Sequence, residues 1–156
     1  MFNHISSKQR LDVAISNAVA EGTPLCVAML DIDHFKKVND SYGHPMGDQV
    51  IRSIAWLLKQ RLRKTDTVGR YGGEEFLVIL PGTHAEQARQ LLDAIRVDFG
   101  QIRHTVQGQS FACTFSGGVC EWSVGVGTEA LIKQADEVLY QAKHAGRNQV
   151  ALPEPV

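Results

Sequence analysis

The chain has 156 residues, of which 44% are hydrophobic and 21% are charged, and its formal net charge is −1. These values are typical of one globular domain that is long enough to bury a core. The near-neutral charge excludes a basic footprint, so no nucleic-acid partner is expected. The longest apolar run, residues 25–30, is far shorter than a membrane span, so direct membrane insertion is not expected.

The cysteines and histidines limit the kinds of redox and metal site that the sequence predicts. Cys26, Cys113 and Cys120 form no CxxC pair and lie in apolar stretches, which predicts buried, reduced thiols in a cytoplasmic protein. No secretory signal pattern stands at the start of the chain. The six histidines are scattered without an HExxH motif, so a zinc site is not expected.

The first elements are a helix and a buried strand. Apolar residues at helical spacing predict an amphipathic helix over residues 7–20, which residues 21–24 stop. The apolar run 25–30 predicts a strand that is buried on both faces and leads into Asp31-Ile32-Asp33. Alternation would point Asp31 and Asp33 to one side and Ile32 to the other. Acids in such a place are costly unless they are solvated or bind a cation.

Residues 34–40 predict a short helical turn that carries Lys36 and Lys37. Its N-terminal amides would lie beside Asp31, and a magnesium–triphosphate needs both an anion-binding and a cation-binding group. A strand that ends in surface acids, followed by a lysine-bearing turn, accounts for the pattern equally well. Asp48 then opens a long helix to about Arg63, where an N-cap at Asp48 and a helix-end cation at Arg63 are sufficient structural explanations.

The hairpin sequence is Arg70-Tyr71-Gly72-Gly73-Glu74-Glu75-Phe76, between extended runs at 67–71 and 76–80. Adjacent glycines are expected to supply the positive φ angles of a two-residue turn. Taken alone, a solvated hairpin whose glutamates keep a sheet edge soluble explains this stretch.

The second half predicts a helix over 84–99, a polar loop over 100–109 and a strand over 110–120. A helix capped by Thr128 and ended by Gly146 follows, with a short strand over 148–152. The alternation of strands and helices around one hairpin predicts an α/β sandwich with a mixed sheet.

Two acidic pairs, Asp31/Asp33 and Glu74/Glu75, each lie at the edge of a predicted strand. If those strands are neighbours, the carboxylates converge and suit magnesium with phosphate oxygens and water. Such a site can orient a phosphoryl attack. The chain has no GxxxxGK[ST] motif, which excludes a P-loop NTPase, and no evident Cys–His or Ser–His–Asp arrangement.

Several separated motifs resemble the GGDEF family of diguanylate cyclases, in its GGEEF form, over nearly all of residues 24–150. They are 31–40, Gly43-His44, Gly47-Asp48, 70–76, Ala135-Asp136, Leu139-Tyr140, Ala142-Lys143 and Gly146-Arg147-Asn148. The resemblance implies a nucleotidyl-cyclase or palm-like α/β fold, with a central mixed, mostly antiparallel sheet of about five strands flanked by helices. It implies one GGDEF catalytic domain over 1–156, with a core at about 24–151 and an N-terminal helix and lead-in at 1–21.

The resemblance also implies the catalytic and metal-binding residues. Asp31, Glu74 and the main-chain carbonyl of Ile32 would hold Mg²⁺, with Mn²⁺ as a possible substitute. Glu75 would act as a second ligand or in proton handling. The terminal phosphates would be bound by the amides of His34 and Phe35 and by Lys36, Lys143 and Arg147, with Gly72 and Gly73 also at the nucleotide. Asn39 and Asp48 would read guanine, and the carboxylate argues for GTP because adenine has no donor there.

The implied reaction condenses two GTP molecules into cyclic di-GMP and releases two pyrophosphates. One domain holds one GTP, so the active species would be a homodimer. Arg63 and Asp66 fit the RxxD product-inhibition motif of the family, beside the helix-end explanation for Arg63. A missing sensory or receiver domain is a further expected partner, and the input that it would sense stays open.

Residues 2–8 depart from the family pattern, which normally has a Leu-Thr-Gly-Leu-x-Asn-Arg-like segment that helps to line the nucleotide pocket. Phe2 and Ile5 keep its hydrophobic positions. The departure favours an alternative, a catalytically silent module that binds GTP or cyclic di-GMP, whereas the intact Gly72 to Glu75 favours the enzyme. A metal-dependent phosphatase would need a water-activating base, for which the same acids are the candidates.

Overall fold

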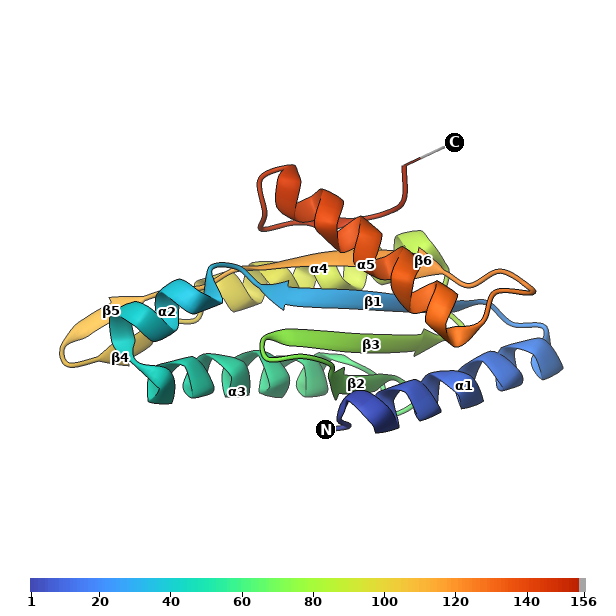
Figure 1. The fold of residues 1–156 in the computed structure, drawn as a ribbon, viewed down its shortest axis with the longest axis horizontal. Helices are drawn as coiled ribbons and strands as arrows, with labels where there is room; N and C mark the ends of the chain where they lie inside the picture. Colours follow the sequence, from blue (N-terminus) through green and yellow to red (C-terminus); the bar gives the residue numbers. More distant parts are fainter. Residues whose placement is uncertain (155–156) are drawn as a thin grey trace.

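The computed structural model describes residues 1–154 (Figure 1). In chain order the elements are α1 (His4–Glu21), β1 (Leu25–Ile32), α2 (Phe35–Tyr42), α3 (His44–Arg61), β2 (Thr67–Arg70), β3 (Glu75–Pro81), α4 (Ala85–Gln101), β4 (His104–Val106), β5 (Gln109–Phe111), β6 (Phe115–Glu121), α5 (Thr128–His144) and β7 (Val150–Ala151). α1 begins earlier than the apolar spacing predicts because Asn3 caps it. Asn3 Oδ1 accepts from the Ser6 amide at 2.9 Å, and Ser6 Oγ accepts from the Asn3 amide at 2.9 Å.

The main sheet within residues 1–154 has five strands in the order β2-β3-β1-β6-β7. β1 lies in the middle, antiparallel to both β3 and β6, and β2 is antiparallel to β3. The pair β6–β7 is parallel. The expected mixed, mostly antiparallel sheet of about five strands flanked by helices is therefore confirmed.

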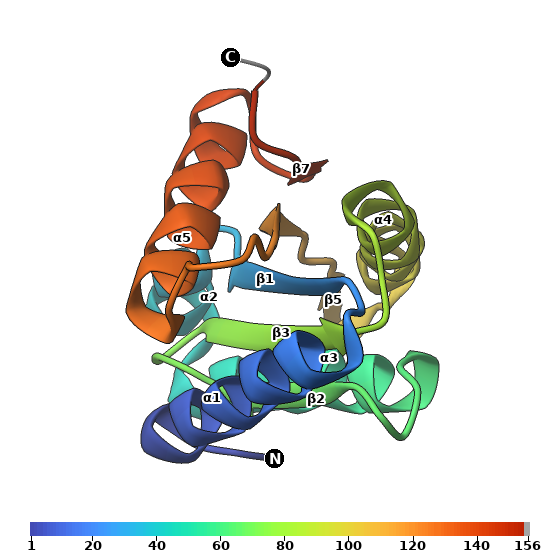
Figure 2. The ribbon, with the colours of Figure 1, turned by 90° about the vertical axis from the view of Figure 1, so that its right-hand side faces the viewer.

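β1 separates two hydrophobic layers, one on each face of the sheet (Figure 2). Its even-numbered residues, from Cys26 to Ile32, pack with α2, α3 and α4. Its odd-numbered residues, from Leu25 to Met29, pack with α1 and α5. All eight residues of β1 are buried, as the apolar run predicts. This central position fixes the end of β1, and hence Asp31, against both layers.

The three cysteines are buried free thiols, as expected. Burial raises the pKa of Cys26 to about 12 and the pKa values of Cys113 and Cys120 to about 11. Little thiolate therefore forms near neutral pH, and these side chains serve as packing groups.

The segment 100–109 is not the polar loop that its composition predicts. α4 continues to Gln101, and β4 and β5 form a separate two-stranded antiparallel sheet. Gln107 and Gly108 both have positive φ, 49° and 79°, as a two-residue hairpin turn requires. The strand expected over 110–120 is consequently split into β5 and β6. The ring of Phe111 stacks on Tyr42 of α2, with 4.1 Å between centroids, so a distant contact anchors this hairpin.

The boundaries of the last helix also differ from the sequence prediction. Gly127 is the N-cap, and Thr128 is the first helical residue. The Thr128 hydroxyl donates to Asp12 of α1 and thereby joins two helices instead of capping one. α5 ends at His144, two residues before Gly146.

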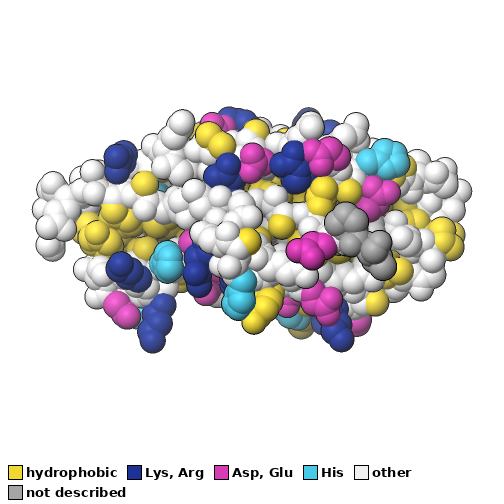
Figure 3. All heavy atoms as spheres, turned by 90° about the horizontal axis from the view of Figure 1, so that it is seen from above, with side chains coloured by type: hydrophobic (Ala, Val, Ile, Leu, Met, Phe, Trp, Pro, Cys, Tyr) yellow, Lys and Arg dark blue, Asp and Glu magenta, His cyan; other side chains and the backbone are white. Residues whose placement is uncertain are grey.

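Charges of both signs are spread over the surface. Figure 3 shows Lys and Arg side chains interspersed with Asp and Glu over the face that it presents, instead of a field of one sign. No helix formed by residues 1–154 has the length and apolarity needed to cross a membrane.

Candidate active site at the carboxyl end of β1

β1 ends beside the loop of the β2–β3 hairpin, and this brings the two acidic pairs together (Figure 1). Asp31 pairs with Glu75 across the antiparallel β1–β3 ladder. One position further on, the main-chain N–H of Ile32 donates to the carbonyl of Glu74 at 3.2 Å. The strands are therefore neighbours, as the convergence of the acids requires.

A lysine from the far end of the chain approaches the same acids. Lys143, in the last turn of α5, donates from Nζ to Asp31 Oδ2 at 2.5 Å. Burial nevertheless raises the pKa of Asp31, and the negative charges of Glu74 and Asp33 add to this against the opposing effect of Lys143. Burial, with the charge of Asp31 next, also raises the pKa of Glu75. The charged forms of both carboxylates are therefore disfavoured where they lie, a cost that a bound cation would offset.

The carboxylate oxygens suit a divalent cation that takes its remaining ligands from phosphate and water. Within residues 1–154, no three His, Cys, Asp or Glu side chains converge as a protein-only metal cage. Mg²⁺ commonly takes one or two carboxylates and completes its octahedron with phosphate oxygens and water. Two carboxylates beside an anion-binding pocket match this coordination of Mg²⁺ better than the coordination that zinc or calcium prefers.

The anion-binding side of the site is the start of α2. His34 has a positive φ of 55° and turns the chain from β1 directly into the helix, which begins at Phe35. The first amides of a helix lack intrahelical acceptors and can bind phosphate. They open onto a pocket of about 190 Å³, lined by Asp31, Ile32, Asp33, His34, Phe35, Lys36, Glu74, Lys143 and Arg147. The structure thus brings together residues that the sequence places at three distant points.

Asn39 and Asp48 lie on adjacent helices, α2 and α3, and are outside the lining of that pocket. Asp48 is an exposed residue inside α3, which begins at His44, so its interpretation as an N-cap is wrong. Asn39 Oδ1 is buried without a hydrogen-bond partner in the described part of the chain. It lies where a Cβ on Gly47 would be only 1.9 Å away, so any side chain at Gly47 would displace the Asn39 amide.

The glycines of the hairpin do not have the predicted conformation. Positive φ angles occur elsewhere, but not at Gly72 or Gly73. The turn is longer than two residues, since the amides of Tyr71 and Gly72 both donate to the carbonyl of Glu75, at 2.8 and 3.3 Å. A Cβ at Gly72 would lie 2.9 Å from Glu75 Oε1, so a side chain there would shift the Glu75 carboxylate.

Sequence reasoning did not single out Arg70 as a functional residue. Its guanidinium donates from Nε and Nη2 to the carbonyl of Gly73, at 3.1 and 2.7 Å, and so holds the loop that carries Glu74. Its place at the base of the Gly-Gly loop was the available signal. The N-terminal segment supports the same loop: His4 Nδ1 lies 2.9 Å from the carbonyl of Tyr71, and the two rings stack 3.9 Å apart.

Arg63 and Asp66 form a separate corner. Asp66 accepts from the main-chain N–H of Arg63 at 2.8 Å and from its guanidinium at 2.9 Å. The same guanidinium reaches the carbonyl of Pro81 and the hydroxyl of Thr83, at 2.8 and 3.0 Å. The hydrogen bond to Asp66 raises the pKa of Arg63. Arg63 therefore fastens the end of β3 and does more than occupy a helix end.

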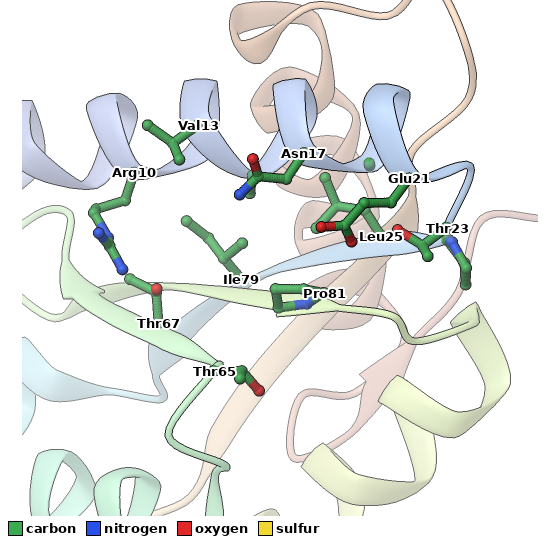
Figure 4. A pocket seen from close by; sticks show the side chains of 13 residues that line it. Arg10, Val13, Asn17, Glu21, Thr23, Leu25, Thr65, Thr67, Ile79 and Pro81 are labelled. Atoms are coloured by element: carbon green, nitrogen blue, oxygen red, sulfur yellow. The ribbon is translucent and has the colours of Figure 1, made fainter.

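A second hollow lies beside this corner, between α1 and the edge of the sheet (Figure 4). Its volume is about 100 Å³, and its polar lining includes Arg10, Asn17 and Glu21 from α1. Thr65 and Pro81 line the side next to the Arg63–Asp66 corner. This hollow shares no residue with the pocket at Asp31 and Glu74.

Comparison with known proteins gives one consistent result. The family model described as diguanylate cyclase, GGDEF domain, matches residues 1–149. Diguanylate cyclase DgcP of Pseudomonas aeruginosa is 39% identical over 148 residues, which cover 95% of this chain and 22% of that protein. Response regulator PleD of Caulobacter vibrioides is 39% identical over 151 residues, which cover 90% of this chain and 32% of that protein. The chain thus spans about a fifth to a third of the length of these relatives.

Solved structures agree over the whole chain. The GGDEF domain of DgcB from Caulobacter crescentus, in complex with c-di-GMP, superposes with a TM-score of 0.94 at 36% identity and covers 98% of this chain and 89% of its own. The active GGEEF domain of a diguanylate cyclase from Vibrio cholerae has a TM-score of 0.92 at 30% identity, with 99% of each chain covered.

Proposed function

Because this chain belongs to the GGDEF-domain family of diguanylate cyclases, we propose that it condenses two GTP molecules into cyclic di-GMP and releases two pyrophosphates. One observation carries the proposal. Asp31 and Glu74 meet Lys36, Lys143 and Arg147 around a single pocket, so cation-binding and phosphate-binding groups face each other. A nucleoside triphosphate with its divalent cation needs this combination.

In the proposed site, Asp31, Glu74 and the carbonyl of Ile32 hold Mg²⁺ or Mn²⁺, and this cation offsets charge on the reacting phosphates. The amides of His34 and Phe35 and the ammonium of Lys36 bind the terminal phosphates. Lys143 donates to Asp31 at 2.5 Å and lines the same pocket as Arg147, so both cations are within reach of a bound phosphate. Burial raises the pKa of Glu75, and this direction suits the proposed role of the carboxyl in proton handling.

Guanine recognition is assigned to the α2–α3 pair. Asn39 has a buried acceptor without a protein partner, and Asp48 adds an exposed carboxylate on the facing helix. Guanine offers N1–H and N2–H donors to such acceptors, whereas adenine does not. The hairpin loop at Gly72 and Gly73 is also assigned to the nucleotide, and a side chain at Gly72 would meet the Glu75 carboxylate.

The reaction needs two copies of the domain. One pocket holds one GTP, and the 3′-hydroxyl that attacks its α-phosphate must come from a second GTP on another domain. The proposed active species is a cytoplasmic homodimer, in which proximity supplies much of the rate. PleD is named as a response regulator, and the curated relatives are longer than this chain, so a receiver or sensory domain is the proposed source of control.

Feedback inhibition by cyclic di-GMP is assigned to Arg63 and Asp66. The Arg63 side chain is 55% exposed although its guanidinium already binds Asp66, so it presents charge to solvent at a defined place. The DgcB domain is described in complex with c-di-GMP, which supports a product site in this family.

The test is to incubate the purified chain with GTP and Mg²⁺ at high protein concentration, while cyclic di-GMP and pyrophosphate are followed by chromatography. Product that disappears in Glu74→Gln and persists in Glu137→Gln, an exposed glutamate on α5, supports the enzyme. GTP binding without product supports the silent binding module, which the departure of residues 2–8 from the family pattern favours. Equal product from the Glu74 and Glu137 variants would refute the assigned site.

A further inference from the structure

Asp33 is a buried carboxylate that the proposed chemistry leaves without a role. It is 5% exposed and lies two residues after Asp31, just beyond the end of β1. The sequence pattern groups it with Asp31 as a metal-binding acid. The hydrogen bonds indicate a different use.

Three donors occupy the two oxygens of Asp33. Oδ1 accepts from Ser116 Oγ at 2.7 Å. Oδ2 accepts from Thr114 Oγ1 at 2.7 Å and from the main-chain N–H of Asn148 at 3.0 Å. A buried carboxylate is stable when hydrogen bonds replace its hydration, and these bonds do so without a metal. Asp33 therefore joins the end of β1 to β6 and to the turn after α5.

That turn has an unusual backbone. Gly146, Arg147 and Asn148 have positive φ angles of 119°, 62° and 48° in succession. Two of the three are not glycine, and such a conformation persists only where surrounding contacts hold it. The Asn148 amide also donates to Ser116 Oγ at 3.1 Å, so both Asp33 and Ser116 accept a hydrogen bond from the turn.

Arg147 is the central residue of this turn, and it lines the same pocket as Asp31 and Glu74. The direction of its side chain depends on the backbone that carries it. We propose that Asp33 is a positioning residue: it anchors the amide of Asn148 and thereby presents Arg147 to the phosphates of the bound nucleotide. This role rests on the proposed function, and it makes Asp33 an acceptor for the protein backbone instead of a metal ligand.

The first test measures the anchor itself by hydrogen exchange of the free protein. Asp33→Ala should speed amide exchange in peptides that cover residues 145–150, whereas Glu137→Ala should not. If Asp33→Ala does not fold, Ser116→Ala is the milder variant, because it removes one donor to Asp33 and one acceptor of the Asn148 amide. Unchanged exchange at residues 145–150 in a folded variant overturns the proposal.

The second test asks whether Asp33 acts through Arg147. Asp33→Ala and Arg147→Ala should each raise the Kd for GTP by about tenfold, the size of one lost charge-assisted phosphate contact. The double variant should be about as weak as Arg147→Ala alone, because the two changes remove the same contact. Additive losses would show that Asp33 acts independently of Arg147 and would overturn the proposal.

The third test separates positioning from metal binding. In Asp33→Asn, the amide oxygen can still accept from Thr114 and Asn148, and the NH₂ group can donate to Ser116. This variant should bind GTP within about threefold of the wild-type affinity, and the Mg²⁺ concentration that gives half-maximal GTP binding should not rise. In Asp31→Asn that Mg²⁺ concentration should rise strongly. A Mg²⁺ requirement that rises equally in both variants would make Asp33 a metal ligand.

The outcomes also distinguish this proposal from the proposed function. If the wild-type chain binds GTP without forming product, the cyclase activity fails while the Asp33–Arg147 cycle is still measured by affinity. If it does not bind GTP at all, the positioning role fails with the function, and the exchange experiment reports only a structural anchor.

Discussion

Two acid–cation pairs in this molecule have opposite surroundings. Arg63 and Asp66 form a closed pair: the Asp66 side chain is fully buried, and the guanidinium also binds Pro81 and Thr83. Lys143 and Asp31 are at least as close, at 2.5 Å, but burial, together with the charges of Glu74 and Asp33, raises the pKa of Asp31. The carboxylate of the first pair has its partners in place, whereas the charged form of the second carboxylate is disfavoured in spite of its lysine.

The difference lies in how far the protein's own groups compensate each carboxylate. A buried carboxylate with all its partners in place, such as Asp66, stabilises a corner, and removal of its arginine leaves the carboxylate without compensation. A cluster that burial and like charges hold in an unfavourable state gains free energy when a cation arrives. The same residue types therefore indicate function only through their surroundings.

The largest expected effect is at Asp31. Asp31→Asn should reduce turnover by at least about a hundredfold, since a proposed cation ligand is lost. Its melting temperature should not fall, because the raised pKa means that the charged form is disfavoured where it lies. Turnover and thermal unfolding of the same preparation check both statements. Undiminished turnover would remove Asp31 from the site, and a large fall in stability would make this pair structural.

The converse is expected at Arg63. Arg63→Ala should lower the free energy of unfolding by about 1–3 kcal/mol, because buried Asp66 loses its charged partner. The initial rate should persist, and product inhibition should be relieved. Urea unfolding measures the change in stability, and progress curves with added cyclic di-GMP measure the product inhibition. The control is Arg89→Ala, which breaks an ion pair with Glu86 on the surface of α4. Inhibition equal to that of the wild type would leave Arg63 as a fastening of β3 alone.

Lys143 is the cation that opposes the raised pKa of Asp31, so its removal tests the electrostatic argument. In Lys143→Ala the acids lose their nearby cation, so Mg²⁺ without nucleotide should raise the melting temperature more than it does in the wild type. GTP affinity should fall by about tenfold, since a proposed phosphate contact is lost. Thermal shift with Mg²⁺ alone, and equilibrium binding of GTP, provide the measurements. A smaller Mg²⁺ effect than in the wild type would contradict the charge argument.

The smallest expected effect concerns a buried group with no counter-charge at all. His104 is 5% exposed, its Nε2 has no partner in the described chain, and burial lowers its pKa below 6.5. Because the folded pKa is lower than the unfolded pKa, the stabilisation is present above about pH 6.5 and is lost as the pH falls. His104→Phe, at a position between Phe99 and Phe111, should flatten this fall, because the group that titrates is removed. Urea unfolding from pH 7.5 to 5 measures it, and an unchanged profile would assign the pH dependence to other groups.

Sequence reasoning succeeded where the signal was local and failed where a distant contact decided. The β4–β5 hairpin was missed because Gln-Gly is a weaker turn signal than the preferred Asn-Gly, and because Phe111 is held by Tyr42 of α2. Asp48 looked like an N-cap, but Gly43 and Pro45 start α3 one turn earlier. The glycines at 72 and 73 were attributed to φ, whereas neither has a positive φ, and a side chain at Gly72 would instead meet the Glu75 carboxylate.

The sequence by itself determined the buried strand β1, the acids at its end and the family of the chain. These depend on apolar runs, helical spacing and contiguous motifs, all of which are written in neighbouring residues. The tertiary structure decided the pairing of Asp31 with Glu75, the approach of Lys143 across 112 residues, and the hydrogen bond from the Asn148 amide to Asp33. Each requires a strand register or a helix packing that brings distant segments to one point. Whether a carboxylate there binds a metal cation, a lysine or a backbone amide depends on which of these groups the fold places within reach.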